Sequence, residues 1–203
     1  MRNKRYKNGF TLAELLLALI VASIITAAVA TLAFALSSAN DSTDDTNQKQ
    51  AQIRYATLRI SELVRHCKMI CGQPGGDLAV WRADENDDGQ ININELVYIE
   101  KGAGSDYLRL CVFPSSVTTH VNLVDIDFSL TSIYEVTYVN LIPQCSNVQF
   151  SLDLVPPNSR FVSISLDTLE NGAVRRYQIN AAIRGWAGNL LNDTGDSIIS
   201  DDD

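Results

Sequence analysis

The amino-acid sequence predicts an α+β protein in which a long N-terminal helix packs with its second half on an antiparallel β-sheet. An almost continuous apolar run extends from Phe10 to Leu36, and from Ile53 onward apolar residues recur at three- and four-residue steps. That spacing places them on one face of a helix. Beyond residue 77 the pattern changes to short apolar segments separated by turn residues, which is typical of strands. A helix followed by consecutive strands gives an α+β fold.

Residues 10–36 have the length and composition of a membrane span. At about 1.5 Å per residue, this helix would exceed the roughly 30 Å of a bilayer's hydrocarbon core. A secretory signal peptide has a shorter apolar stretch, of about 7–15 residues. Four basic residues precede Gly9 and favour a cytoplasmic N-terminus, so the rest of the chain would be exported. An ordinary single-span anchor and a long secretory signal cleaved near residues 35–38 are the alternatives.

Glu14 is the one charged residue in this run, and a carboxylate in lipid costs roughly 2.5 kcal/mol or more. The segment Gly9-Phe10-Thr11-Leu12-Ala13-Glu14 resembles the cleavage and methylation motif of the type IV prepilin and type II secretion pseudopilin superfamily. The resemblance implies that a prepilin peptidase cleaves after Gly9 and that the new N-terminal Phe10 is methylated. It also implies that Glu14 pairs with the N-terminal amine of a neighbouring subunit, which would offset the cost of its charge. The motif covers only about thirty residues and does not identify the machine that the subunit serves.

Residues 37–72 are expected to form a polar hinge and an amphipathic helix. Residues 37–52 are rich in Ser, Asn, Asp, Thr and Gln, so the helix could either continue through them or break and restart. From residue 53 the apolar positions share one face and should enter the core: Ile53, Ala56, Ile60, Leu63, Val64 and Cys67. We expect the helix to end near Cys71, where Gly-Gln-Pro-Gly-Gly would stop it.

Residues 73–188 are expected to form an antiparallel β domain. A two-residue hairpin signal, Asn171-Gly172, separates the last two strands, and Pro156-Pro157 ends an earlier one. The segment 117–141 predicts one short helix and a connecting strand. Residues 189–203 form an acidic tail that we expect to fray. The predicted strands span residues 78–83, 96–100, 107–113, 148–154, 160–166 and 174–180.

The loop 84–95 fits a twelve-residue calcium-binding loop of the EF-hand type. Side-chain oxygens fall at positions one, three and five, Gly89 takes the sharp turn at position six, and Glu95 closes the loop at position twelve. This pattern suits a hard cation that prefers oxygen ligands. The predicted ligands are Asp84, Asn86, Asp88, Gln90 through its backbone carbonyl, Asn92 and Glu95.

The flanks of this loop are strand-like and no second loop is available to pair with it, so only the loop chemistry of an EF-hand applies. The alternative is a solvated hairpin tip rich in Asn, Asp and Gly. Five carboxylates within twelve residues would repel one another without a cation, which favours a structural Ca²⁺. On this view, Glu95→Gln would lower thermal stability only when calcium is present.

The even number of cysteines favours one or two disulfides in an exported domain, with free buried thiols as the alternative. The candidates are Cys67, Cys71, Cys111 and Cys145. The chain is acidic, with a formal charge of −8, and loss of the four basic leader residues leaves 12 Lys and Arg against 24 Asp and Glu. Such a charge does not favour nucleic acid as a partner.

The sequence contains no nucleophile elbow, phosphate-binding loop or His-Glu-x-x-His motif, so it predicts no enzyme. The resemblance implies a structural subunit, a minor pseudopilin or minor pilin, of a type II secretion pseudopilus or type IV pilus. Its partners would be prepilin peptidase and other such subunits in the inner membrane, with residues 1–9 as a cytoplasmic leader and a periplasmic C-terminal domain. A membrane-anchored, calcium-dependent binding or adhesion module is the second hypothesis, and an anchored hydrolase with an unrecognised site is the third.

Overall fold

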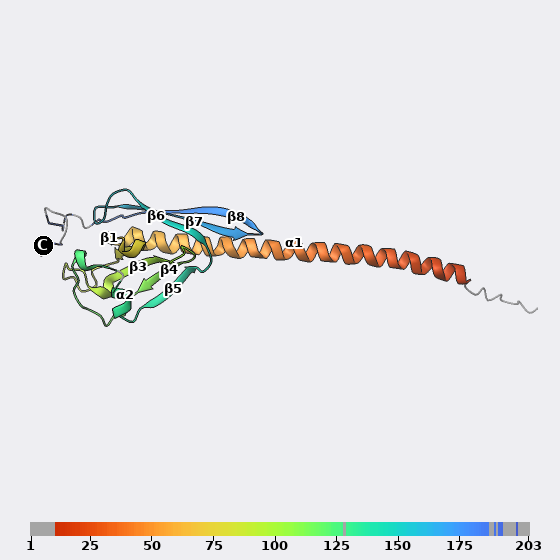
Figure 1. Ribbon diagram of the computed structural model, residues 1–203, viewed down its shortest axis with the longest axis horizontal. Coiled ribbons are helices and arrows are strands. Elements are labelled where there is room, and N and C mark those ends of the chain that lie inside the picture. The colour runs from red at the N-terminus through yellow and green to blue at the C-terminus, as the bar shows by residue number, and fades with distance from the viewer. Residues whose placement is uncertain (1–10, 128, 187–188, 190, 193–197, 199–203) are drawn as a thin grey trace, which may run out of the picture. The chain divides into compact units, whose positions relative to one another are not determined.

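The computed structural model describes residues 11–127, 129–186, 189, 191–192 and 198, and it has the predicted α+β arrangement (Figure 1). The leader 1–9, Phe10 and most of the predicted tail 189–203 lie outside these residues. The chain divides into two compact units, residues 1–46 and residues 47–203. Each unit is described by itself.

In the first unit the chain is helical from Leu12, the start of helix α1, which spans Leu12–His66. In this unit the large apolar side chains of the helix are exposed; Leu17 is 67% and Phe34 is 79% exposed. This helix is long and apolar enough to cross a membrane. The polar residues after Leu36 are helical too, and they bond locally, as where the Thr43 hydroxyl donates to the Ala39 carbonyl at 2.9 Å.

Helix α1 ends at His66 and not near Cys71, so the predicted end of the helix was wrong. The amide of Cys67 still bonds to the Leu63 carbonyl at 2.9 Å, but the amide of Lys68 donates to the Trp81 carbonyl at 2.9 Å. The backbone has therefore already left the helix and begun to pair with a strand. Residues Met69–Gly72 form strand β1, and the Gly-Gln-Pro-Gly-Gly segment connects this strand to the next.

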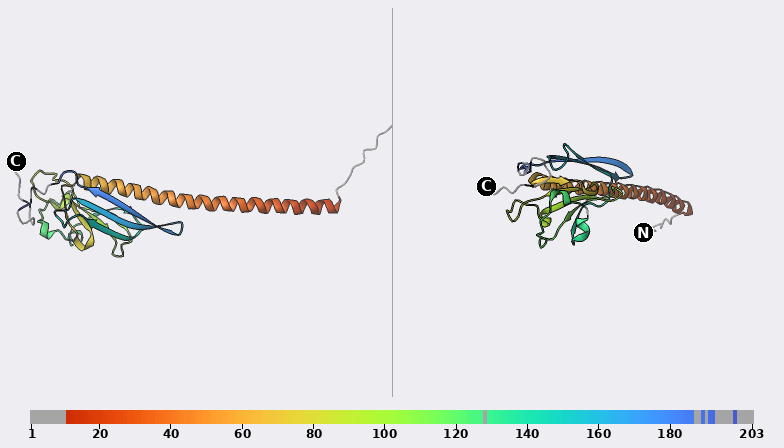
Figure 2. Two further views of the ribbon diagram at one scale, coloured as in Figure 1. Left: turned by 90° about the horizontal axis from the view of Figure 1, so that it is seen from above. Right: turned by 60° about the vertical axis from the view of Figure 1, so that its left-hand side comes forward.

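The strands form two antiparallel sheets, where the sequence predicted one. The five-stranded sheet has the order β1-β2-β3-β4-β5 and the three-stranded sheet the order β6-β7-β8. The last part of α1 lies between the two sheets (Figures 1 and 2), so each sheet buries one apolar face against the same helix. The strands after β1 are β2 Leu78–Trp81, β3 Leu96–Lys101, β4 Leu108–Val112, β5 Thr137–Ile142, β6 Ser146–Leu152, β7 Phe161–Glu170 and β8 Ala173–Ala182.

Two apolar cores follow from this arrangement. The first contains the predicted helix face together with one face of each sheet: Ile53, Ala56, Ile60, Val64 and Cys67 are buried in it, and Leu63 packs at its edge. The second lies on the other face of the five-stranded sheet and contains Trp81, Tyr98 and Phe113. Residues alternate between the cores along β3, as a pleated strand requires. The five-stranded sheet is therefore covered on both faces.

The connection between β4 and β5 contains the short helix α2, Leu130–Ile133, and the 3₁₀ turn Leu123–Asp125. The prediction of one short helix and a strand in this segment is confirmed. The β7–β8 hairpin also has the predicted turn, with Asn171 and Gly172 at φ of 50° and 76°. Positive φ at both residues matches the tight turns that Asn-Gly favours.

A buried group of charged residues joins β2, β3 and β4. Glu100 is 5% exposed and accepts two hydrogen bonds from Arg109, at 2.9 and 2.8 Å, and one from the Tyr107 hydroxyl at 2.9 Å. Asp77, also 5% exposed, accepts a hydrogen bond from the amide of Lys101 at 2.9 Å. Burial raises the pKa of Asp77 to about 6, and the nearby charge of Glu100 adds to this increase.

We expect Asp77→Asn to remove a pH dependence of stability. Because the folded-state pKa lies above the ordinary value of 3.8, the folded chain binds more protons than the unfolded chain between about pH 4 and pH 6. The contribution of Asp77 to stability is therefore lost as pH rises through this window, by about 2–3 kcal/mol. Urea unfolding of the full chain in detergent at pH 4 and pH 7 measures this contribution to the free energy of unfolding. An equal change in stability between the two pH values in the wild type and in Asp77→Asn would contradict the prediction. Asp125→Asn, at an exposed carboxylate, is the control.

Candidate functional site

The first turn of α1 carries the predicted assembly residue, Glu14. Its Oε2 atom accepts hydrogen bonds from the backbone N–H and the hydroxyl of Thr11, both at 2.9 Å. The amide of Glu14 in turn donates to the Thr11 hydroxyl oxygen at 3.3 Å. The predicted cleavage and methylation positions, Gly9 and Phe10, lie outside the described residues.

Thr11 and Glu14 form a capping box, in which each side chain satisfies a backbone amide of the other residue. The carboxylate of Glu14 therefore has hydrogen-bond donors within its own helix before any partner is present. Sequence analysis missed the role of Thr11, although Thr-x-x-Glu at the start of an apolar run is a recognisable capping signal. The arrangement holds the carboxylate at the helix N-terminus, where the helix dipole also favours negative charge.

The first half of the loop 84–95 folds around two carboxylates. Asp84 accepts hydrogen bonds from the amides of Asp88 and Gly89, at 3.2 and 2.9 Å. Asp88 accepts from the amide of Gln90 at 2.8 Å and from the side chain of Asn86 at 2.6 Å. Gly89 has φ of 68°, the left-handed conformation that the sharp turn at position six requires.

The middle of the loop pairs with the segment 119–121. The amide of Val121 donates to the Ile91 carbonyl at 2.9 Å, and the amide of Ile93 donates to the Thr119 carbonyl at 3.0 Å. Ile91 is 1% exposed and belongs to the second core. This pairing therefore fixes the middle of the loop to the segment 119–121.

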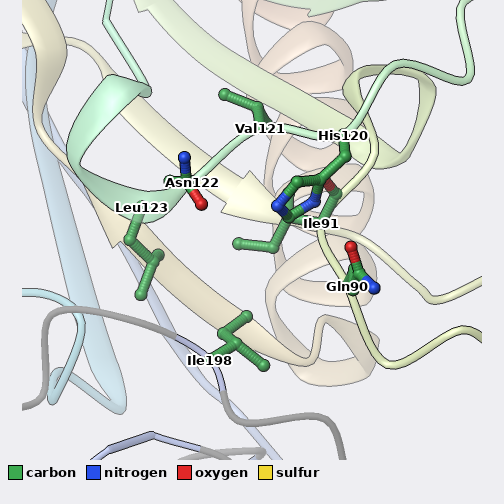
Figure 3. A pocket seen from close by; sticks show the side chains of 7 residues that line it. All are labelled: Gln90, Ile91, His120, Val121, Asn122, Leu123 and Ile198. Carbon is green, nitrogen blue, oxygen red and sulfur yellow. The ribbon is translucent and has the colours of Figure 1, made fainter.

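A small pocket of about 150 Å³ lies beside this pairing (Figure 3). Its polar groups are the side chains of Gln90, His120 and Asn122, and Nδ1 of His120 lies 3.2 Å from the Ile91 carbonyl oxygen. The pocket brings together no nucleophile and base. The full lining is Gln90, Ile91, His120, Val121, Asn122, Leu123 and Ile198.

Glu95 points into the protein and is 1% exposed. Its Oε2 atom accepts hydrogen bonds from the Trp81 indole at 3.0 Å and from the amide of Asn92 at 3.2 Å. Its Oε1 atom accepts from the amide of Glu85 at 2.8 Å. The carboxylate therefore ties both ends of the loop to strand β2, a structural role that the sequence analysis did not predict.

The residue types of the loop are ones that calcium prefers, since they offer carboxylate, amide and carbonyl oxygens. The residues that would hold the ion are Asp84, Asn86 and Asp88, with Gln90 through its carbonyl, Asn92, and Glu95 once it exchanges its present donors. Within the described part of the chain, which includes the whole loop, no three His, Cys, Asp or Glu side chains form a group that could hold a metal ion. A bound Ca²⁺ would supply positive charge to the loop.

All four cysteines are free thiols in the structure, contrary to the expected disulfides. Cys71 on β1 and Cys111 on β4 are separated by β2 and β3, about 14 Å at the usual strand spacing, which no disulfide spans. Cys67 follows the end of α1, and Cys145 lies between β5 and β6. Burial raises the pKa of Cys67 and of Cys111 to about 12, and that of Cys145 to about 11, so these thiols are protonated at neutral pH.

Comparison with protein families gives a match in the N-terminal segment. The model of the prokaryotic N-terminal methylation motif matches residues 4–30, a range that includes Gly9, Phe10, Thr11 and Glu14. No curated protein and no solved structure matches the chain significantly. The motif implies processing by prepilin peptidase and assembly with other pilin subunits, and it indicates a structural subunit rather than an enzyme. Residues 4–30 of this chain are the prokaryotic N-terminal methylation motif, the prepilin-type signature of pilins and pseudopilins.

Proposed function

We propose that this chain is a minor pseudopilin or minor pilin, a structural subunit of a type II secretion pseudopilus or type IV pilus. The observation that carries the proposal is the methylation motif at residues 4–30, which overlaps the start of an exposed apolar helix. Prepilin peptidase removes residues 1–9 and Phe10 becomes the methylated N-terminus. The mature subunit is then anchored once in the inner membrane with its C-terminal domain in the periplasm.

Glu14 is the assembly residue in this proposal. Its carboxylate would accept the N-terminal amine of Phe10 from a neighbouring subunit, a pairing that removes an uncompensated charge from lipid. Thr11 keeps the carboxylate hydrogen-bonded until then, because its amide and hydroxyl both lie 2.9 Å from Oε2. Thr11 therefore holds Glu14 in the unassembled subunit, and the pairing of Glu14 with the amine of Phe10 would set the register of the assembled one.

The loop 84–95 would hold a structural Ca²⁺ in the exported domain. Support comes from the oxygen donor set, the positive φ of Gly89 and the buried Ile91, which fixes the loop against the second core. Affinity in the range of extracellular modules, on the order of 10⁻⁴ to 10⁻³ M, would suffice there. The ion would stiffen the connection between β2 and β3.

A membrane-anchored, calcium-dependent binding or adhesion module is the second candidate. The same loop favours it, because a rigid, exposed acidic turn can present a ligand-binding surface. The two candidates differ in their partners: a subunit co-purifies with other prepilin-like proteins, whereas a binding module binds its ligand without them.

The intact mass of the protein extracted from membranes tests the proposal. We expect loss of residues 1–9 and the gain of one methyl group on Phe10. A full-length mass would instead indicate an ordinary anchored domain, and cleavage near residues 35–38 would indicate a secreted protein. Either of these results would overturn the assembly role of Glu14. The same spectrum before and after reduction counts any disulfides.

A further inference from the structure

A positive charge lies at the first ligand position of the loop 84–95. The ammonium Nζ of Lys68 is 3.6 Å from Oδ2 of Asp84, whose side chain is 2% exposed. Lys68 lies outside the loop, between the end of α1 and the start of β1, and its backbone amide is fixed by a hydrogen bond to the Trp81 carbonyl at 2.9 Å. The lysine is thus held in place by the sheet, and its charge reaches a carboxylate with almost no access to water.

The same lysine is linked to the last ligand position through Trp81. Its ammonium lies 5.4 Å from the centre of the Trp81 ring, within the range of a cation–π interaction. The indole N–H of Trp81 donates to Glu95. Lys68 and Trp81 therefore add, without a metal ion, to the backbone amides that hold the two carboxylates at the beginning and end of the loop.

We propose that Lys68 is the counter-cation of Asp84 when no metal ion is bound, and that Ca²⁺ must displace its ammonium group from that carboxylate. The inference rests on the proposed calcium site. A cation tethered by its own side chain competes with calcium at position one and repels it, so Lys68 lowers the affinity of the loop. It also limits the repulsion among the loop carboxylates, so the loop can fold before calcium binds.

Calcium affinity of the full mature chain in detergent tests this role. In a Trp186→Phe background, Trp81 fluorescence during titration with calcium chloride reports binding. We expect Lys68→Met, which keeps the aliphatic stem over Trp81, to bind calcium about tenfold more tightly than the parent, allowing for screening of a side chain that is 38% exposed. Without calcium, the amides of Asp88 and Gly89 should exchange faster with deuterium, because Asp84 has lost its counter-charge.

Two variants test whether the effect requires a positive charge at residue 68 or follows from the loss of any nearby positive charge. Lys68→Arg keeps the charge and should bind calcium like the parent. Arg82→Met removes one positive charge from the pair with Glu85, a carboxylate outside the ligand set, and should change affinity less than Lys68→Met. Lys68→Gln replaces Lys68→Met if the latter does not fold.

The outcomes distinguish the inference from the calcium proposal. Calcium binding that is equal in the parent and in Lys68→Met, or an equal gain in Arg82→Met, overturns the role of Lys68 and leaves the calcium site in place. Calcium binding by none of the variants overturns the calcium site and, with it, the competition by Lys68.

Discussion

Glu14→Ala is expected to enter the membrane normally and to fail to enter a pilus or pseudopilus. The apolar run keeps its length and loses its one charge, so insertion should be as favourable as before or more so. Assembly loses the carboxylate that would pair with the amine of Phe10 on the next subunit. We expect at least a tenfold drop in the subunit recovered in sheared fibres, with an unchanged amount in the membrane fraction. Normal recovery of Glu14→Ala in fibres would contradict the proposed pairing.

Two matched variants separate the ion pair from the capping box. Thr11→Val removes the hydroxyl that lies 2.9 Å from Oε2 of Glu14 but keeps the backbone N–H. It should weaken the helix cap by about 1 kcal/mol and leave the charge of Glu14 unchanged. Glu14→Gln keeps the size of the side chain and one acceptor oxygen but removes the negative charge. If assembly depends on the ion pair, Glu14→Gln behaves like Glu14→Ala, whereas Thr11→Val still assembles.

The parts of the fold that follow from local periodicity could be predicted from the sequence. Ile53, Ala56, Ile60 and Val64 share a face because the helical repeat places them there, and all are buried. The hairpin at Asn171-Gly172 follows from the φ values that this pair tolerates. In both cases residues close in the sequence determine the structure.

The parts of the fold that depend on contacts between residues far apart in the sequence could not be predicted in this way. Helix α1 ends at His66 because the amide of Lys68 bonds to the Trp81 carbonyl on strand β2, a contact that is not visible in the periodicity of the helix. The second sheet exists because α1 offers two sides for packing, and strand patterns alone do not say which strands pair. A single sheet was the simpler expectation and it was wrong.

The loop illustrates the same limit at the candidate site. The spacing of Asp84, Gly89 and Ile91 indicated the turn and its apolar anchor, and the structure has both. The side-chain donor to Glu95 is Trp81 and the cation beside Asp84 is Lys68; both lie before the loop and match no motif. Only the pairing of β1 with β2 brings them to it.

Glu95→Ala is expected to lower the stability of the compact unit of residues 47–203 by about 3 kcal/mol or more. The substitution leaves the buried Trp81 indole and Asn92 amide, and the partly buried Glu85 amide, without their acceptor. Buried unpaired donors cost about 1–3 kcal/mol each without adding fully. Thermal unfolding of the full chain in detergent should show a decrease in Tm of roughly 10 °C. Glu85→Ala is the control, because its side chain is 49% exposed and its loss should cost less than about 1 kcal/mol.

Glu95→Gln separates the hydrogen-bonding role of this residue from a role as calcium ligand. The sequence alone predicted a loss of stability only in the presence of calcium. In the structure the carboxylate accepts three hydrogen bonds without a metal ion, and a glutamine would turn an NH₂ group toward at least one donor. We therefore expect a lower Tm both with and without calcium, and a larger decrease with it. A variant that melts like the parent in calcium-free buffer would show that Glu95 matters to the loop only as a ligand.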